Sequence, residues 1–148
     1  MKSWTLRLCA ALAAMLSDSA TAQVTTDGTV GARVDRSGEF VAVESALGRR
    51  AGGNLIHSFE RFSVDGGRGI FGVPDGVENV IGRVTGAEAS VLNGLISFAD
   101  DATLRLNVAA DFWFFNPNGV LIGENAQFRT SGALYFSGGD TLRFADGS

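Results

Sequence analysis

Cysteine and histidine are nearly absent from the chain, which has one of each, Cys9 and His57. A disulfide needs two cysteines, so the sequence contains no disulfide framework. An ordinary zinc site takes three or four nitrogen, sulfur or oxygen ligands, which a lone histidine does not supply. We therefore expect no metal or other cofactor. Stability must come from packing and from backbone hydrogen bonds.

Positive charge is also scarce. Lys2 is the only lysine, and 12 basic residues stand against 16 acidic ones, so the net charge is −4. Proteins that bind nucleic acid usually show a basic patch, and this balance argues against a nucleic-acid partner. No apolar run after residue 22 is long enough to cross a membrane as a helix.

The first 22 residues have the composition of a secretory signal peptide. Lys2 and Arg7 carry positive charge, residues 8–16 form a short apolar run, and residues 20–22 match the A-x-A cleavage pattern. A membrane anchor is the alternative, but the run is about half of the roughly 20 residues that a bilayer span needs. The pattern predicts a mature chain that starts near Gln23.

Glycine is frequent, with 20 residues, whereas proline occurs twice. Turn pairs such as Asp27-Gly28 and Asn93-Gly94 recur at short intervals, and glycine supplies the positive φ values that tight turns need. The stretches between the turns are short and rich in β-branched and aromatic residues, which is typical of strands. We expect strands at residues 39–44, 70–73, 80–85, 91–98, 103–108, 112–115, 120–122, 133–136 and 141–144, and a mixed segment at 59–64.

No segment has a convincing helical pattern. Residues 54–62 come nearest, through the spacing of Ile56, Phe59 and Phe62, and we interpret them as a strand or an irregular cap. The chain shows no linker and no strict repeat, so one all-β domain is predicted after residue 22. A sandwich, a barrel and a β-helix all remain open at this point.

Residues that could carry catalysis are few and poorly arranged. His57 could belong to a Ser-His-Asp triad, but the chain has no Gly-x-Ser-x-Gly elbow. Asp100 and Asp101 form a carboxylate pair, as glycoside cleavage would need, but adjacent carboxylates of this kind are expected in a solvated turn. Asp75 and Glu78 are interpreted in the same way. We expect a protein without enzymatic activity.

Two glycine-rich stretches match ligand-binding patterns. Residues 67–72 match G-x-G-x-x-G, but a dinucleotide site needs a helix after the glycines, and residues 73–76 predict a turn instead. Asp65-Gly66-Gly67 is similar to calcium-binding β-roll repeats, but the nonapeptide period is missing. We interpret both matches as products of a glycine-rich composition.

The most informative tetrapeptide is Asn116-Pro117-Asn118-Gly119, which lies between the apolar runs 112–115 and 120–122. Pro117 restricts φ, Asn118 tolerates the left-handed region, and Gly119 adopts positive φ readily. The tetrapeptide predicts a sharp turn between two buried strands, whatever else it does.

Four blocks, at residues 54–64, 78–86, 90–96 and 110–123, form a recognisable series. The first is similar to an "NLFHSF" block, the second contains Arg-Val-Thr-Gly, and the last contains Asn-Pro-Asn-Gly. In this order they resemble the N-terminal secretion domain of filamentous haemagglutinin-like exoproteins, the passengers of two-partner secretion. The residues that carry the resemblance are Asn54, His57, Phe59, Phe62, Asn79, Arg83, Thr85, Gly86, Ser90, Gly94, Asn116, Pro117, Asn118 and Gly119.

The chain departs from the family pattern at several points. A second family motif, NPNL, is absent. Glu88-Ala89 stands where many relatives have Asn-Pro, and Trp113 is bulkier than the usual aliphatic residue. Family members also usually continue for hundreds of residues, so we expect residues 23–148 to be a secretion domain that is truncated before its passenger.

The resemblance implies a right-handed parallel β-helix with an N-terminal cap and extra antiparallel strands. It implies passage through the Sec translocase, then recognition in the periplasm by an outer-membrane β-barrel transporter, then folding outside the cell on this domain. The implied location is the medium or the surface of a Gram-negative-type bacterium. Host surfaces or other cells would be partners of a missing passenger. Residues 116–119 would act as a transporter-recognition motif or as a folding turn.

A stand-alone secreted adhesin or carbohydrate-binding module is the alternative function. Trp113 and Phe115 could stack on sugars if they were exposed. Because they lie in an uninterrupted apolar run, we expect both in the core. A polysaccharide-degrading β-helix enzyme would need charged residues clustered on stacked turns, and the sequence shows no such set.

Overall fold

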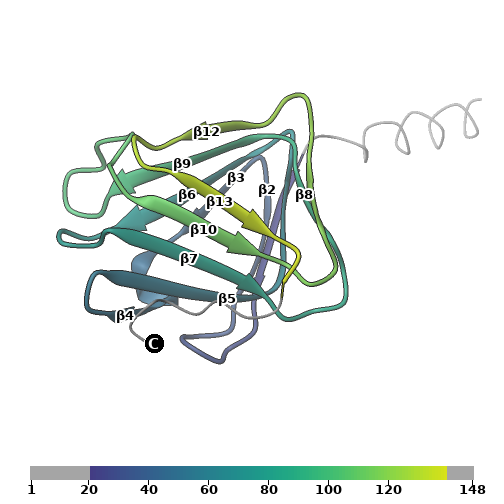
Figure 1. Cartoon of the computed structure of the whole chain (residues 1–148), viewed down its shortest axis with the longest axis horizontal. Coiled ribbons are helices and arrows are strands. Elements are labelled where there is room, and N and C mark those ends of the chain that lie inside the picture. Colours follow the sequence, from purple (N-terminus) through teal and green to yellow (C-terminus); the bar gives the residue numbers. More distant parts are fainter. Residues whose placement is uncertain (1–20, 140–148) are drawn as a thin grey trace, which may run out of the picture.

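The computed structural model describes residues 21–139, and strands dominate this part of the chain (Figure 1). Its elements are β1 (Thr21–Thr26), β2 (Asp35–Gly38), β3 (Phe40–Val43), the 3-10 turn η1 (Ser45–Leu47), β4 (Arg49–Ala51), β5 (Asn54–Asp65), β6 (Arg68–Val73), β7 (Asn79–Val84), β8 (Ser90–Leu92), β9 (Leu95–Asp100), β10 (Asp111–Phe115), β11 (Val120–Ile122), β12 (Gln127–Arg129) and β13 (Leu134–Ser137). The predicted all-β class is confirmed. Within residues 21–139 no helix is long and apolar enough to span a bilayer.

The strands form two sheets. In the four-stranded sheet, β3, β6, β9 and β12 are all parallel to their neighbours. The larger sheet contains the parallel strands β5, β7, β10 and β13, which lie side by side in Figure 1, together with the parallel pair β8 and β11. Three further strands, β1, β2 and β4, pair antiparallel at one edge of this sheet. The prediction of extra antiparallel strands is therefore confirmed.

The chain winds between the two sheets. After β5 it crosses to β6, returns to β7 and β8, crosses to β9, returns to β10 and β11, and crosses again to β12 before β13. Each winding places its strands parallel beside those of the winding before. As a result, Leu55, Val80, Phe112 and Leu134 form one row across the larger sheet.

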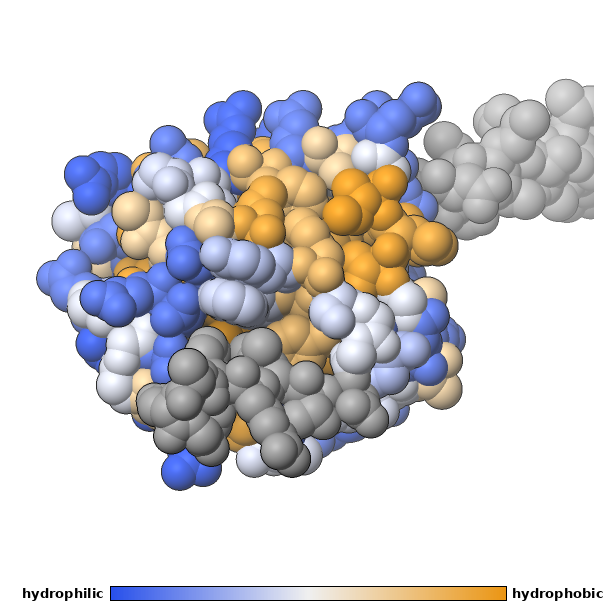
Figure 2. Space-filling view, viewed as in Figure 1, coloured by the Kyte–Doolittle hydropathy of each residue, from blue (hydrophilic) through white to orange (hydrophobic). Residues whose placement is uncertain are grey.

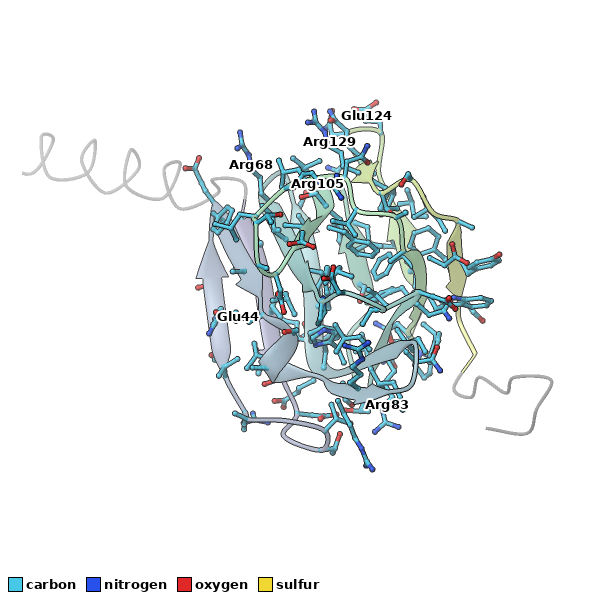
Figure 3. All side chains as sticks on the ribbon, turned by 90° about the vertical axis from the view of Figure 1, so that its left-hand side faces the viewer. Glu44, Arg68, Arg83, Arg105, Glu124 and Arg129 are labelled. Carbon is cyan, nitrogen blue, oxygen red and sulfur yellow. The ribbon has the colours of Figure 1, made fainter. Side chains whose placement is uncertain are left out.

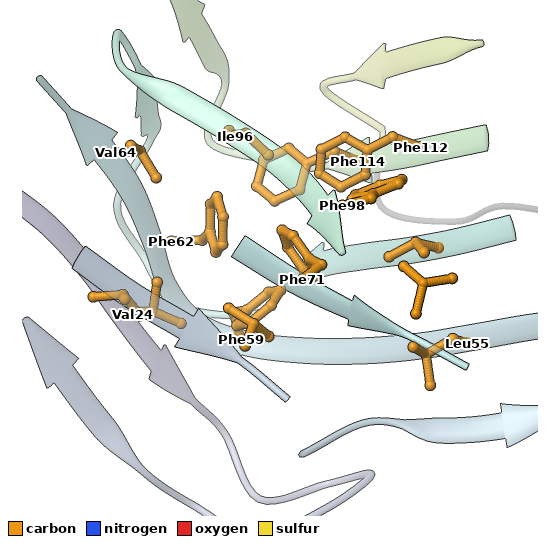
Figure 4. Packing of buried hydrophobic residues seen from close by; sticks show 14 of the residues in the cluster. Val24, Leu55, Phe59, Phe62, Val64, Phe71, Ile96, Phe98, Phe112 and Phe114 are labelled. Carbon is orange, nitrogen blue, oxygen red and sulfur yellow. The ribbon is translucent and has the colours of Figure 1, made fainter. Parts of the chain in front are cut away.

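The space between the sheets is filled by phenylalanine (Figure 4). Six phenylalanine side chains are each less than 2% exposed: Phe59, Phe62, Phe71, Phe98, Phe112 and Phe114. Phe71 lies at the centre of this cluster, with its ring centroid 5.6 Å from that of Phe62, 5.7 Å from that of Phe98 and 5.4 Å from that of Phe112. Aromatic pairs at such distances add to the stabilisation that burial alone provides.

One predicted strand is wrong. Residues 103–108 form an irregular segment in which Leu104 and Asn107 have φ values of 57° and 66°. The carboxylate of Asp100 accepts hydrogen bonds from the backbone N–H groups of Ala102 and Thr103. These local bonds favour a turn, and they outweigh the strand-like alternation of leucine and polar residues in this segment.

Several other predicted segments differ from the strands of the structure or lie outside the described residues. The predicted strand at residues 91–98 is divided at a corner into β8 and β9, and the predicted strand-or-cap segment from residue 54 is the long strand β5. The polar strands β1, β2, β4 and β12 were outside the predicted segments. The predicted strand at residues 141–144 and most of the predicted signal peptide lie outside the described residues.

Candidate functional site

The Asn-Pro-Asn-Gly turn packs on the corner formed by residues 86–90. Asn116 is fully buried. Its side-chain amide donates to the carbonyl oxygen of Glu88 at 2.8 Å and to Oγ of Ser90 at 3.0 Å. Its side-chain oxygen accepts from the backbone N–H of Asn118 at 2.9 Å. One buried side chain therefore joins the turn to the preceding winding.

The other three residues of the turn are more accessible. Pro117 and Asn118 are exposed, although the Asn118 amide donates to the carbonyl oxygen of Gly86 at 2.6 Å. Gly119 has a φ of 110°, which favours glycine, and its carbonyl accepts from the N–H of Ser90 at 3.1 Å. The predicted turn is confirmed, and only its tip is available to a partner. The prediction that both flanking strands are buried is wrong, because Leu121 and Ile122 of β11 are exposed.

Two glycines of the family blocks are required by close packing between windings. A Cβ atom on Gly86 would lie 2.0 Å from the carbonyl oxygen of Glu60, and one on Gly94 would lie 2.4 Å from that of Gly67. Real Cβ atoms do not approach backbone oxygen so closely, so any side chain at either position would force the windings apart. These glycines therefore set the stacking distance at two corners.

A polar network attaches β1 to the Arg-Val-Thr-Gly block. The carboxylate of Asp27 accepts hydrogen bonds from the hydroxyls of Ser58 at 2.6 Å, Thr85 at 2.7 Å and Thr29 at 2.7 Å. Nε of Arg83 donates to Oγ of Ser58 at 2.9 Å. Partial burial raises the pKa of Asp27, but the hydrogen bonds outweigh it and lower the pKa to about 2. The carboxylate is therefore ionised at neutral pH.

A second row of side chains runs across the outside of the larger sheet. The amide of Asn79 donates to the side-chain oxygen of Asn54 at 2.9 Å, and the indole N–H of Trp113 donates to that of Asn79 at 2.9 Å. The Trp113 ring stacks on Tyr135 with centroids 3.7 Å apart. The prediction that Trp113 lies in the core is wrong, because it alternates with the inward Phe112 and Phe114. Phe115 is buried, as predicted.

His57 is fully buried among aromatic side chains. Its ring centroid lies 5.8 Å from that of Phe59 and 5.4 Å from that of Phe71. Neither ring nitrogen has a hydrogen-bond partner in the described structure, so His57 lacks the serine and carboxylate contacts of a triad. Burial lowers the pKa of His57 to about 4, so the ring is neutral at neutral pH.

The remaining candidate motifs are dispersed. Asp101 is exposed in the turn after β9, as expected, whereas Asp100 is the half-buried last residue of β9. The glycine-rich stretch at residues 67–72 lies mostly in β6, with no helix after it in the described chain. Residues 21–139 contain no group of three side chains able to hold a metal ion. The sequence analysis missed Asp27 and Ser58, although an Asp-Gly turn and the first block contain them.

An ion pair lies at one of the positions at which the sequence departs from the expected family pattern. The carboxylate of Glu88 lies 2.7 Å from the guanidinium of Arg61. The pair connects β5 to the corner on which the Asn-Pro-Asn-Gly turn packs. Both side chains are well exposed, so the pair adds little to stability.

The comparisons with known proteins bear on the whole region that the structure describes. A family model, the TPS secretion domain, matches residues 22–148. Neither the comparison with curated proteins nor that with solved structures found a match.

Proposed function

The chain belongs to the TPS secretion domain family, the secretion domain of two-partner secretion exoproteins, and we propose that a transporter recognises it and that it then starts the folding of a β-helix outside the cell. On this proposal the Sec translocase delivers the chain to the periplasm, and the periplasmic domains of an outer-membrane transporter recognise it. The parallel windings are the first coils of a right-handed parallel β-helix, with β1, β2 and β4 as its cap. The domain acts through binding and folding and carries out no catalysis.

The interlocked windings are the observation that carries this proposal. Asn116 joins one corner to the next, and Asp27 joins the cap to Ser58 of β5 and to Thr85, just after β7. Ser58 and Thr85, in two of the family blocks, bond Asp27 after β1, and Ser90, in a third block, bonds Asn116 of the next winding. A unit held in this way can fold first and offer its last strands as a template.

Recognition of extended chain by strand addition is the proposed mode in the periplasm. In the folded state Asn116 is buried and joins two windings by hydrogen bonds, so we assign it to folding, and direct contact of residues 116–119 with the transporter in the extended chain is the rival role. On this assignment, replacement of Asn116 lowers secretion because the chain folds poorly after it emerges.

Secretion with and without the cognate transporter tests the proposal. The chain is expressed in a Gram-negative host and assayed in the medium and in the periplasm, and we expect it in the medium only when the transporter is present. Asn116→Ala should reduce both secretion and the stability of the purified chain, whereas Asn125→Ala, at an exposed asparagine, serves as the matched control.

Two outcomes would contradict the proposal. A wild-type chain that stays folded in the periplasm with the transporter present would rule out a working secretion domain. If the Asn116→Ala chain has unchanged stability but is still not secreted, Asn116 acts in recognition by the transporter and not in folding.

A further inference from the structure

The chain contains two Asn-Gly dipeptides, and both lie at corners of the windings. Asn93-Gly94 lies between β8 and β9, and Asn118-Gly119 lies between β10 and β11. Glycine has no side chain to shield its backbone nitrogen, so in a flexible chain this nitrogen readily approaches the side-chain carbonyl carbon of the preceding asparagine. An Asn-Gly dipeptide is therefore the sequence context in which asparagine, a chemically labile residue, deamidates most readily.

The reaction needs only the chain itself and water. The backbone nitrogen of the glycine attacks Cγ of the asparagine and forms a new N–Cγ bond. The Cγ–Nδ2 bond breaks, and the side-chain nitrogen leaves as ammonia with the proton that the glycine nitrogen loses. Water then opens the five-membered succinimide at either of its carbonyl carbons, which gives aspartate or isoaspartate with no change of oxidation state.

The Asn-Pro-Asn-Gly turn combines a resistant asparagine with a vulnerable one. Asn116 precedes Pro117, whose nitrogen carries no hydrogen, so the attack that starts the reaction is blocked. Asn118 precedes Gly119 and has no such protection in the sequence. The buried asparagine that joins two windings is thus the resistant one, and the exposed asparagine at the tip depends on the fold for protection.

The folded structure holds the reacting atoms of Asn118 and Gly119 in other contacts. The N–H of Gly119 donates to the carbonyl oxygen of Asn116 at 2.9 Å, so the attacking nitrogen is occupied. The side-chain amide of Asn118 donates to the carbonyl oxygen of Gly86 at 2.6 Å and to Oδ1 of Asn116 at 3.0 Å. The reaction would break these bonds, so the turn has to open before Asn118 can react.

The side chain of Asn93 is held in a similar way at the other corner. Its Oδ1 accepts from the backbone N–H of Asn125 at 2.9 Å, and its Nδ2 donates to Oδ1 of Asp65 at 3.1 Å. The same oxygen lies against Gly123, where a Cβ atom would be only 2.1 Å away. Asn93 is therefore bonded to the winding before it and to the winding after it, and it cannot turn toward Gly94 without losing both bonds.

Deamidation would reverse the fit at both corners. A carboxylate at position 118 would present an oxygen to the carbonyl oxygen of Gly86 where the amide now donates. A carboxylate at position 93 would face the carboxylate of Asp65. Unpaired acceptors and adjacent like charges are both unfavourable, so the product of the reaction cannot rebuild the corner as the asparagine does.

The two corners lie in different parts of the molecule. Glu124 directly precedes Asn125 at the Asn93 corner, and Arg83 shortly precedes Gly86 at the Asn118 corner. Figure 3 shows the labelled side chains of Glu124 and Arg83 at opposite ends of the structure. Effects at sites that share no partners usually add, so damage at either corner lowers stability by itself.

We propose that Asn93 and Asn118 are sites of spontaneous deamidation in the unfolded chain, that folding protects both, and that their deamidation records the time the chain has spent unfolded. The link to export rests on the function proposed above, in which the transporter recognises the chain in extended form. A chain that waits too long unfolded loses the amides that hold two corners. It then folds into a less stable domain.

Peptide mass spectrometry of the purified chain tests the chemistry, in buffer and in guanidinium chloride at the same neutral pH. We expect Asn93 and Asn118 to deamidate at least about tenfold faster in the denatured chain, because the folded chain reacts only when a corner opens. Asn125, which precedes alanine, and Asn116 are the internal controls and should react slowly in both states. Isoaspartate at positions 93 and 118, detected with an isoaspartyl methyltransferase, identifies the succinimide route.

Substitutions that reproduce the aspartate product measure its cost. Asn93→Asp and Asn118→Asp should each raise the unfolding equilibrium constant in urea by about tenfold, because each loses a donor and gains an unfavourable acceptor. Asn125→Asp, at an exposed asparagine, should change this constant by less than about twofold. Asn118→Gln keeps the amide but requires a larger ring, so it should suppress deamidation at this position in the denatured chain.

The proposal is wrong if folded and denatured chains deamidate at the same rate, if neither Asn-Gly site reacts in denaturant, or if both aspartate variants are as stable as the wild type. Expression without the transporter tests the link to export, since chain retained in the periplasm should carry more isoaspartate at positions 93 and 118 than secreted chain. If the purified chain behaves as expected but retained chain carries no more isoaspartate, the chain waits folded, and the unfolded wait is refuted while the chemistry stands.

Discussion

The two edges of the larger sheet are built differently. At the first edge, β1 pairs antiparallel with β5, and the Asp27 network fastens it to Ser58 and Thr85. At the last edge, the described chain ends in the short strands β11 and β13, on which Leu121, Ile122 and Leu134 are 61%, 52% and 39% exposed. Figure 2 shows an apolar area on this side, beside β8.

The difference bears on the templating role proposed above. An edge closed by antiparallel strands resists pairing with further strands, whereas an open parallel edge with apolar side chains favours it. On the function proposed above, the closed edge would protect the start of the windings and the open edge would accept the next winding. If this comparison is correct, damage near the closed edge and in the core should cost more stability than equal damage at the open edge.

The largest effect is expected in the phenylalanine cluster. Phe71→Ala removes a fully buried ring that pairs with five other aromatic rings, and it should lower the free energy of unfolding by about 3–5 kcal/mol. Phe136→Ala, at a half-buried phenylalanine of β13, should cost about half as much. Urea unfolding of both variants measures the ratio. Equal losses would mean that the open edge is as well packed as the centre.

The next effect comes from His57 as the pH falls. Burial lowers its pKa from 6.5 to about 4, so the unfolded chain binds the proton at a higher pH than the folded chain. Above pH 6.5 the free energy of unfolding is therefore higher than at low pH by up to about 3 kcal/mol on account of His57. This difference is lost as the pH falls from 6.5 through 4. His57→Leu should remove most of this slope in urea unfolding. A slope that persists in the variant would assign the acid sensitivity to other groups.

Glycine substitutions compare the two edges directly. Gly86→Ala places a Cβ atom against the carbonyl oxygen of Glu60 and should destabilise the chain by about 2–3 kcal/mol. Gly138→Ala, after β13, meets only the carbonyl oxygen of Asn116 at 3.9 Å and should change stability by less than about 0.5 kcal/mol. Thermal unfolding followed by circular dichroism is sufficient to rank the pair, and the reverse ranking would refute tight stacking at the Gly86 corner.

The smallest effect concerns Asp27, at the closed edge. Its pKa is about 2 in the folded chain against 3.8 when unpaired, so its contribution is present above pH 3.8 and is lost as the pH falls through 2. After allowance for partial exposure, the contribution at neutral pH is about 1–2 kcal/mol. Asp27→Asn should show this loss at pH 5 and none near pH 2. Asp75→Asn, at an exposed turn, is the control.

Much of the architecture could be read from local patterns. Most of the glycine-bounded strands and the turn at residues 116–119 are present in the structure. These features depend on neighbours within a few residues, because a strand alternates its side chains and a turn needs particular φ values. The uninterrupted run at residues 112–115 was ambiguous for the same reason, and only the sheet shows that Trp113 faces outward.

What the sequence determined by itself is the all-β class, the positions of the principal turns and the family blocks that mark a secretion domain. Only the tertiary structure decided which residues of those blocks touch. Ser58 and Thr85 meet Asp27 across 31 and 58 positions, and Asn116 meets Ser90 across 26. The register between successive windings decides such contacts, and that register depends on how whole strands and corners stack, which no local pattern specifies.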